Sequence, residues 1–346
     1  MNHYSKVIVS ILVTTFSLSL CSQQIEIITS GTKTSIRGLC VVNDKVIWAS
    51  GSNGWFGKSI DGGKTWKWDV VQGFQDSEFR DIEAFDANNA ILMTISEPGQ
   101  ILKTTDGGIN WKVVFTDATK GIFFDAMDFA DDDNGVVIGD PLPGSQFIYR
   151  VYTRNGGINW FRAAEDTLHI SPILKGEAMF ASSGTNVVFL KSDGFLRNNK
   201  MLIVTGGTAA NLLSQGPVQK TALQIIKGKE STGANSIAVF NPKTFTIVGG
   251  DFSNDKDSTL NCVLTLDGGA TLLNPSTPPH GYRSCVEYIT RNKLITCGTS
   301  GIDVSEDGGL NWKNISKESF HVCMKAKKGT TVFLAGNNGR IAKLIW

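Results

Sequence analysis

The sequence predicts an all-β fold: a ring of seven four-stranded antiparallel blades, which is a β-propeller. Three observations predict it. A short phrase built around Asp-Gly-Gly returns five times, short runs of alternating apolar and polar residues precede each copy, and turns rich in Gly, Asn and Asp separate these runs. Self-similarity at a period of tens of residues indicates a repeat architecture. Period-two alternation broken by such turns indicates strands joined by hairpins.

The repeated phrase sets the number of blades. Between the third residues of successive copies, the intervals are 45, 49, 112 and 40 residues. Because 112 is about twice the other values, a degenerate copy is expected inside that gap, at Val204–Gly207, which keeps two glycines. The five clear copies span residues 59–66, 104–111, 153–160, 265–272 and 305–312.

Each residue of the phrase has an expected structural role. The Asp carboxylate accepts backbone N–H groups of its own turn, the glycines take positive φ without steric cost, and the Trp packs a large ring between neighbouring sheets. Four of the eight tryptophans occupy this one position. The residues to which we assign these structural roles are Asp61, Trp66, Asp106, Trp111, Asn155, Trp160, Asp267, Asp307 and Trp312.

Three alternating runs precede each phrase and a fourth follows it, which gives the four strands of a blade. The first strands are expected to begin near Arg37, Arg80, Asp125, Glu177, Asn235 and Arg283, and at Phe320 in the seventh blade.

The seventh blade lacks its fourth strand, because the sequence stops at Trp346. Residues 25–28 form a lone apolar run before the first blade, so we expect this N-terminal strand to pair with the last blade. Closing the ring in this way leaves no blade with an open side. Residues 24–346 are accordingly predicted to form a single β-propeller domain.

The composition excludes one class of partner. The 33 basic and 32 acidic residues leave a formal net charge of +1. A protein without a field of one sign is not drawn to nucleic acid or to an anionic membrane surface. We therefore expect no nucleic-acid partner.

The N-terminus has the features of a signal peptide. Lys6 precedes an apolar run from residue 7 to residue 20, which is too short to span a bilayer, and small or polar residues follow. Residues 1–23 are therefore predicted to be a cleaved signal, with a secreted or periplasmic mature protein. A lipid anchor at Cys21 is the alternative. No later segment is long and apolar enough for a transmembrane helix.

The cysteines and acidic clusters give no metal signature. The five cysteines after residue 23 are scattered and contain no Cys-x-x-Cys, so we interpret them as small buried apolar residues. The alternative for Cys285 and Cys323, which have equivalent places in consecutive repeats, is a disulfide. The acidic stretches at residues 131–134 and 251–257 lack the ligand spacing of a calcium loop and are interpreted as hairpin turns.

Residues 59–66 match every position of the Asp-box, Ser-x-Asp-x-Gly-x-Thr-Trp, and thus resemble BNR or sialidase-type repeats. Other copies depart from it, with Asn155 for Asp and Leu272 for Trp. From Ile25 to the C-terminus the layout resembles the photosystem II stability/assembly factor-like group of seven-bladed propellers. That resemblance implies boxes at the periphery without catalytic roles, and a function defined by a partner.

The resemblance also raises a sialidase as an alternative. Sialidases carry an Arg-Ile-Pro motif, which is absent here, and Tyr282 beside Arg283 has no recognisable partner as a nucleophile pair. Nucleophile elbows, phosphate loops and dinucleotide fingerprints are absent as well. We therefore assign no catalytic residue and expect no cofactor.

The first strands of a propeller line its central channel, and strand ends at one mouth form a common binding surface. Converging arginines suit a carboxylate or a peptide C-terminus, because guanidinium binds such groups through two parallel hydrogen bonds. The alternative is an internal salt-bridge network that closes the channel. The ligand-binding residues predicted at this mouth are Arg37, Arg80, Asp125, Glu177, Arg283 and His321.

The sequence favours a non-catalytic binding or assembly scaffold, expected to be monomeric, that holds a protein or peptide partner at one mouth of the channel. The alternative is an enzyme on the same scaffold, either a sialidase-like glycoside hydrolase or an oxidoreductase. Fold analogy alone cannot support the alternative.

Overall fold

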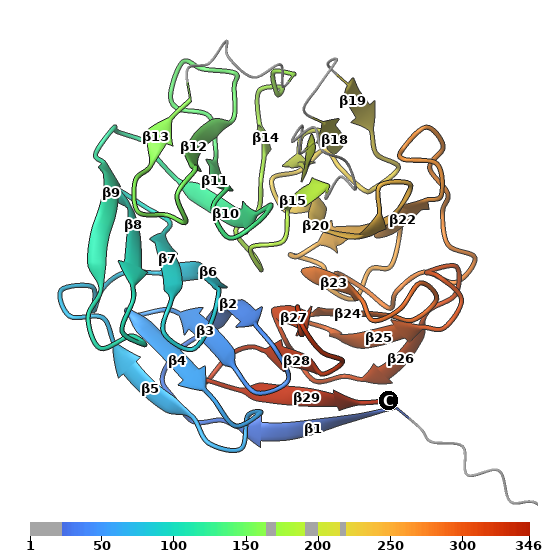
Figure 1. The fold of residues 1–346 in the computed structure, drawn as a ribbon. Helices are drawn as coiled ribbons and strands as arrows, with labels where there is room; N and C mark the ends of the chain where they lie inside the picture. The colour runs from blue at the N-terminus through green and yellow to red at the C-terminus, as the bar shows by residue number, and fades with distance from the viewer. Residues whose placement is uncertain (1–22, 164–170, 191–199, 215–218) are drawn as a thin grey trace, which may run out of the picture.

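The computed structural model describes residues 23–163, 171–190, 200–214 and 219–346, and all regular elements in these ranges are β-strands. The strands form seven antiparallel sheets arranged as blades in a ring (Figure 1). The predicted all-β, seven-bladed propeller is therefore confirmed. Within the described ranges no helix has the length and apolar character needed to cross a membrane.

Blades one to three are regular, with four strands each in chain order from the centre outward (Figure 1). Their strands are β2 (Ile36–Val41), β3 (Ile47–Gly51), β4 (Trp55–Ser59), β5 (Lys67–Val70), β6 (Phe79–Ala84), β7 (Ala90–Thr94), β8 (Gly99–Thr104), β9 (Lys112–Asp117), β10 (Phe124–Phe129), β11 (Gly135–Gly139), β12 (Tyr149–Thr153) and β13 (Phe161–Arg162).

Blade four has an interrupted inner strand. β14 and β15 pair with the consecutive segments β17 and β16, so they are two pieces of one strand, and residues 179–186 loop out between them. We call residues 179–186 the channel loop. The strands are β14 (Glu177–Ala178), β15 (Val187–Leu190), β16 (Lys200–Val204), β17 (Gly206–Gly207), β18 (Asn211–Ser214) and β19 (Gln219–Ala222).

The prediction of a degenerate copy of the phrase at Val204–Gly207 is wrong. These residues end the second strand of blade four, and Gly206 also pairs with Gly233 of blade five. The clear copies of the phrase instead connect the third and fourth strands of a blade, as residues 59–66 do between β4 and β5. The corresponding connection of blade four lies between β18 and β19, at 215–218, outside the described residues.

Blade five has three full strands, and its fourth is reduced to a bridge between Leu264 and Leu273. Blade six is regular. Their strands are β20 (Thr232–Asn241), β21 (Thr244–Asp251), β22 (Cys262–Thr265), β23 (Cys285–Tyr288), β24 (Leu294–Gly298), β25 (Gly301–Ser305) and β26 (Lys313–Ser316).

The two ends of the chain build blade seven together. Its strands are β27 (Val322–Lys325), β28 (Val332–Ala335), β29 (Ile341–Ile345) and β1 (Gln24–Thr29). β1 pairs antiparallel with β29, with Gln24 opposite Ile345 and Ile27 opposite Ala342. Figure 1 shows this closure, with the first strand lying along the last. The predicted pairing of the N-terminal strand is confirmed. The predicted signal peptide, 1–23, falls almost wholly outside the described residues.

The repeated phrase folds as its residue types predict. In the first copy, Asp61 Oδ1 accepts the backbone N–H of Thr65 at 2.9 Å, and the Ser59 hydroxyl accepts the N–H of Gly63 at 2.9 Å. Asn155 takes the place of the Asp in the third copy and accepts the N–H of Asn159 at 3.0 Å. The phrase therefore closes its turn with either an Asp or an Asn.

The tryptophans of the phrase pack between blades. Trp111 of blade two meets Trp48 and Phe56 of blade one edge to face, at ring-centroid distances of 6.3 and 5.3 Å. Trp312 is buried, whereas Trp66 and Trp160 are partly buried against the cores beside them. The apolar clusters of the protein lie at these junctions, so each phrase fastens its blade to the preceding one.

Candidate functional site

The inner strands share a bulge that defines one equivalent position around the ring. In four blades the strand register shifts at this place, which is occupied by Arg37, Arg80, Asp125 and Asn235. In blade seven, the backbone N–H of His321 donates to Ala335 O at 2.8 Å. In blade six, the N–H of Ser284 makes the corresponding bond to Cys297 O at 2.9 Å. Ser284 is therefore the blade-six member of this set.

Two of the six residues predicted at the channel mouth, Glu177 and Arg283, lie one residue before this shared position. Arg283 precedes Ser284 and corresponds to Phe320, because the N–H of each donates to the carbonyl of a glycine in the second strand of the preceding blade, Gly249 of β21 or Gly298 of β24. In blade four Glu177 pairs with Gly207, as Ile36 pairs with Gly51, so Ala178 and not Glu177 is the equivalent residue. Arg283 and Glu177 occupy the preceding position, which holds an apolar residue in the other blades. The charge of these two residues gives no indication of this difference in position.

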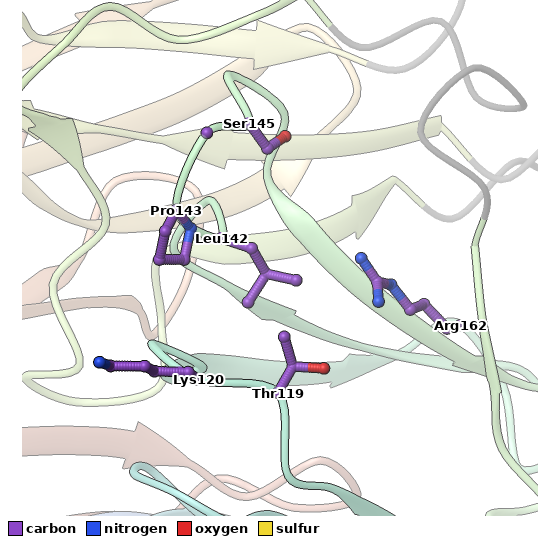
Figure 2. Close-up of a pocket in the computed structure, with 7 residues that line it drawn as sticks. Thr119, Lys120, Leu142, Pro143, Ser145 and Arg162 are labelled. Carbon is purple, nitrogen blue, oxygen red and sulfur yellow. The ribbon is translucent and has the colours of Figure 1, made fainter.

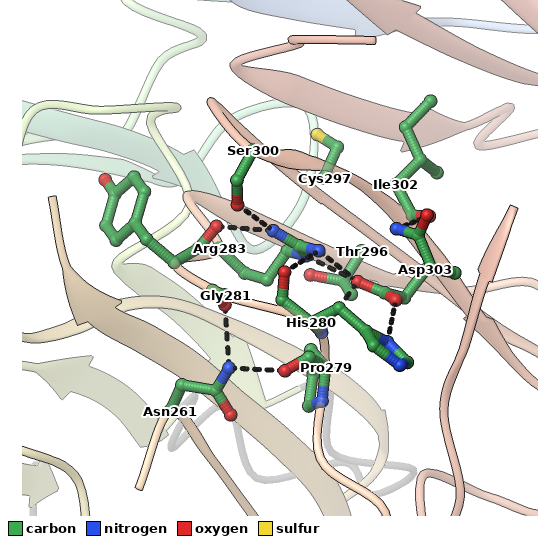
Figure 3. A network of polar contacts seen from close by, with 12 residues as sticks. Asn261, Pro279, His280, Gly281, Arg283, Thr296, Cys297, Ser300, Ile302 and Asp303 are labelled. Carbon is green, nitrogen blue, oxygen red and sulfur yellow. Dashed lines mark hydrogen bonds and ion pairs between the residues drawn. The ribbon is translucent and has the colours of Figure 1, made fainter. Parts of the chain in front are cut away.

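Arg283 belongs to a buried polar network rather than to the channel surface (Figure 3). Its side chain is fully buried, and Nε donates to Asp303 Oδ2 at 2.7 Å. It also donates to the Ser300 hydroxyl at 2.8 Å and to the His280 carbonyl at 3.0 Å. Asp303 in turn binds His280 Nδ1 at 2.7 Å. Arg283 thus holds its own blade together, and its predicted place at the channel mouth is wrong.

The side chains of Glu177 and Asp125 are also buried and do not line the channel mouth. Glu177 accepts hydrogen bonds from Thr205 at 2.6 Å and Asn211 at 2.7 Å, and pairs with Lys220 at 2.9 Å. Asp125 is fully buried, and burial together with the nearby Asp140 raises the pKa of its carboxyl well above the usual range. These two acids therefore do not present a charged surface to a ligand.

A pocket of about 530 Å³ lies where the inner strands begin, and it contains three of the six predicted ligand-binding residues: Arg37, Arg80 and His321. All seven blades contribute to it, blade four through Ala178 and the channel loop. Its other lining residues are Phe123, Asp140, Ala178, Met179, Phe180, Ala181, Ser182, Asn235, Phe252, Tyr282, Ser284 and Thr299.

The channel loop positions both arginines. Arg37 donates from a guanidinium nitrogen to Ser182 O at 3.2 Å, and Arg80 donates to Ala181 O at 3.3 Å. The loop is itself fixed from other blades, since the Ser183 hydroxyl donates to Ser284 O at 2.7 Å. Neutral carbonyls orient the two guanidiniums here without cancelling their charge.

The arginines dominate the electrostatics of the pocket. Burial and the charge of Arg80 lower the pKa of Arg37. Burial and the two guanidiniums lower the pKa of His321 to about 4, so this imidazole is neutral at pH 7. Burial raises the pKa of Asp140 to about 6. Within the described residues Arg80 has a carboxylate partner, Glu78 at 3.5 Å, and Arg37 has none.

A larger hollow of about 690 Å³ lies on blade three (Figure 2), lined by Thr119, Lys120, Leu142, Pro143, Ser145 and Arg162. Arg162 is exposed, and its guanidinium stacks 4.8 Å from the centre of the Tyr149 ring. This hollow brings together no buried charge, so the pocket at the channel mouth is the better candidate for a ligand site.

The described part of the chain contains no group of three or more His, Cys, Asp or Glu side chains arranged to hold a metal ion. The two acidic stretches form turns that are closed by their own carboxylates. Asp131 accepts the backbone N–H of Asn134 at 2.8 Å, and Asp251 accepts the backbone N–H of Ser253 at 2.9 Å. The five cysteines within the described residues are buried free thiols, so no disulfide joins Cys285 to Cys323.

The sequence matches no protein-family model and no curated protein. The fold, however, matches solved propellers. YCF48, in a structure bound to a D1 peptide, is similar with a TM-score of 0.64 at 15% identity, over 95% of this chain and 98% of that one. YCF48 from Cyanidioschyzon merolae gives 0.62 at 17% identity, over 92% and 98%. The WD40 domain of Neurospora crassa Pan2 gives 0.59 at 13% identity, over 90% and 89%. At such identities the likeness shows the fold.

Sequence reasoning missed the apolar side of the pocket and the channel loop. Phe180, Ser182 and Phe252 carry no motif and no charge pattern. The signal that could have located the shared position is a glycine at or near the end of the second strand, such as Gly51, Gly139, Gly249 and Gly298, since each lies directly against the backbone where the inner strand begins.

Proposed function

We propose that this protein is a non-catalytic scaffold that binds a peptide segment of a protein partner in the pocket at the channel mouth. Arg37 and Arg80 carry the proposal. Their guanidiniums share one pocket, are held by backbone carbonyls, and lie close enough for one to lower the pKa of the other. Two such cations suit the carboxylate of a peptide C-terminus, which accepts paired hydrogen bonds from guanidinium.

Two further observations support a peptide. The pocket volume of about 530 Å³ falls in the range of pockets that take small ligands or a few residues. YCF48, a propeller of similar fold, has been solved with a D1 peptide bound. We extend peptide binding to this chain as part of the proposal, together with the assignment of the repeated phrases as Asp-boxes.

The test is fluorescence anisotropy with labelled random hexapeptide pools, one pool with free C-termini and one with amidated C-termini. The wild-type protein should bind the free-carboxylate pool, and amidation should weaken binding. Arg37→Ala and Arg80→Ala should each weaken it about tenfold or more, the usual effect of removing a charge-assisted hydrogen bond.

Arg291→Ala is the matched control, because it removes an exposed arginine in a turn between β23 and β24, outside the pocket lining. It should leave the affinity unchanged, and circular dichroism should show all variants folded. Equal binding of the two pools, or equal affinity of the Arg37 variant and the wild type, would refute a carboxylate site.

We also propose that the protein is exported, with residues 1–23 removed. The apolar run from residue 7 to residue 20 supports this, as Lys6 precedes it and small or polar residues follow it. N-terminal sequencing of protein recovered from the cell envelope and the medium tests it. A mature N-terminus near residue 24 is expected, and an intact Met1 would contradict it.

A further inference from the structure

Three aromatic side chains form a continuous surface in the pocket. Phe180, Phe252 and Tyr282 all line it. The rings of Phe180 and Phe252 meet edge to face with centroids 5.9 Å apart, and those of Phe252 and Tyr282 do so at 6.2 Å. We call these three residues the aromatic wall. Phe252 is 48% exposed, so the wall presents apolar surface to water in the free protein.

The aromatic wall lies directly beside the two arginines. Phe180 begins the segment whose next two carbonyls, those of Ala181 and Ser182, accept hydrogen bonds from Arg80 and Arg37. On the other side, Tyr282 lies close enough to Arg37 for each residue to affect the pKa of the other. The two arginines and the aromatic wall therefore form adjacent surfaces of one pocket.

The aromatic wall is held in place. The Tyr282 hydroxyl donates to Asn235 Oδ1 at 2.9 Å, and the Ser182 hydroxyl donates to the same oxygen at 3.2 Å. Phe180 lies against the backbone of Gly206, so close that a Cβ there would stand 2.2 Å from its ring. Because the rings and the cations are already fixed in the free protein, little conformational entropy is lost on binding, and the pocket can discriminate between ligands.

We propose that the aromatic wall reads the side chain of the residue whose carboxylate binds Arg37 and Arg80, and selects a peptide that ends in an aliphatic or aromatic residue. The proposal rests on the proposed function and adds its specificity. A C-terminal residue carries its carboxylate and its side chain on one Cα, so an anion on the arginines brings that side chain against the neighbouring rings. Covering Phe252 removes apolar surface from water, which favours an apolar side chain over a polar one.

The experiment measures the affinities of six-residue Gly/Ser peptides that differ only in the last residue: Phe, Leu, Ser or Gly, all with free carboxylates. The wild type should bind the Phe and Leu peptides about tenfold more tightly than the Gly peptide, the usual discrimination of an apolar pocket. In Phe252→Ala this preference should disappear, so that the Phe, Leu and Gly peptides bind with similar affinities. Phe252→Leu should keep part of it.

Phe240→Ala is the control. Phe240 is 42% exposed and packs against Tyr288 at 5.7 Å, but it does not line the pocket. This variant should keep the full preference. Equal wild-type affinity for all four peptides would overturn the proposed selection and leave the carboxylate site standing, as would a Phe252→Ala variant that retains the preference. If no peptide binds the wild type, the proposed function fails, and the selection fails with it.

Discussion

Asp303 accepts a hydrogen bond from Arg283 Nε at 2.7 Å, and both side chains are fully buried. Arg283 stands where blades one, two, three and seven bury an Ile or a Phe, so the pair replaces an apolar contact with a charged one. Breaking a buried pair by removing one partner leaves the other charge uncompensated.

Arg283→Met should therefore destabilise the protein by about 3–5 kcal/mol. Arg37→Met, which removes a cation at the pocket without leaving a buried carboxylate unpaired, should cost less than about 1.5 kcal/mol. Urea unfolding followed by tryptophan fluorescence measures both. Equal midpoints for Arg283→Met and the wild type would contradict the structural role of Arg283.

The repeated phrase offers a comparison within one chain. Hydrogen bonds from Thr65 lower the pKa of Asp61 to about 2, so this carboxylate stays ionised at any ordinary pH. Because Asn155 closes the same turn in another copy, Asp61→Asn should change the Tm little. Asp61→Ala, which removes the acceptor, should lower the Tm by about 2–4 °C. Thermal unfolding followed by circular dichroism checks the pair, and identical Tm values for both variants would contradict the capping role.

Much of the fold could be predicted, because turn chemistry and period-two patterning are local signals. The phrase at Asp61 and its copies gave the number of blades, and the lone apolar run at residues 25–28 gave the closure. Blade four could not be predicted well, because the channel loop interrupts its inner strand and breaks the alternation.

The candidate site was harder to predict, for a different reason. Arg37, Arg80 and His321 share a pocket because they occupy one position of a repeated strand, which an alignment can find. The sequence also predicts Arg283 at this mouth, but its carboxylate partner, Asp303, lies on β25, so only the three-dimensional fold shows that the two residues form a buried pair. Phe252 lies in a turn without a repeat, so only the three-dimensional fold brings it to the pocket.

Ring closure through β1 should be essential for stability. Ile25 and Ile28 pack onto the core that joins blades six, seven and one, and β1 covers the open edge of β29. Deleting residues 24–29 should lower the free energy of unfolding on the order of 3–5 kcal/mol, from two lost apolar side chains and a lost strand pairing. A chain that begins at Gln23 is the control. Equal urea midpoints for the two chains would contradict this role for β1.

Stability should fall as the pH rises through the range set by Asp128. Burial raises the pKa of this carboxyl to about 7, with Glu83 and Lys327 nearby, whereas in an unfolded chain its pKa is about 3.9. Between these values the folded protein holds a proton that the unfolded chain has released. The stability from that proton is complete below about pH 4 and is lost as the pH passes 7.

Asp128→Asn keeps an acceptor for the Phe189 N–H, which now donates to Asp128 at 2.6 Å. The variant should gain stability relative to the wild type at pH 8, on the order of 1–3 kcal/mol, and little at pH 4. Asp76→Asn changes the charge equally at an exposed site and is the control. A gain that is equal at both pH values would contradict ionisation of Asp128 as its cause.

The buried thiols should be inert in the folded protein. Burial raises the pKa of Cys40 to about 12 and also raises the pKa of Cys262, Cys297 and Cys323, and the thiolate is the form that reacts. In Cys285 the effect of burial is outweighed by hydrogen bonds with Cys297 and Cys323, which lower its pKa, so the inertness of this thiol depends on its lack of solvent contact. A chain that begins at Gln23 and is treated with N-ethylmaleimide at pH 7 should gain no adduct by mass spectrometry, and five adducts after unfolding in guanidinium chloride. Fewer than five adducts after unfolding without reductant would reveal a disulfide. Rapid labelling of the native protein would mean that the blade junctions open far more often than their packing implies, since reagent reaches these sulfurs only by local unfolding.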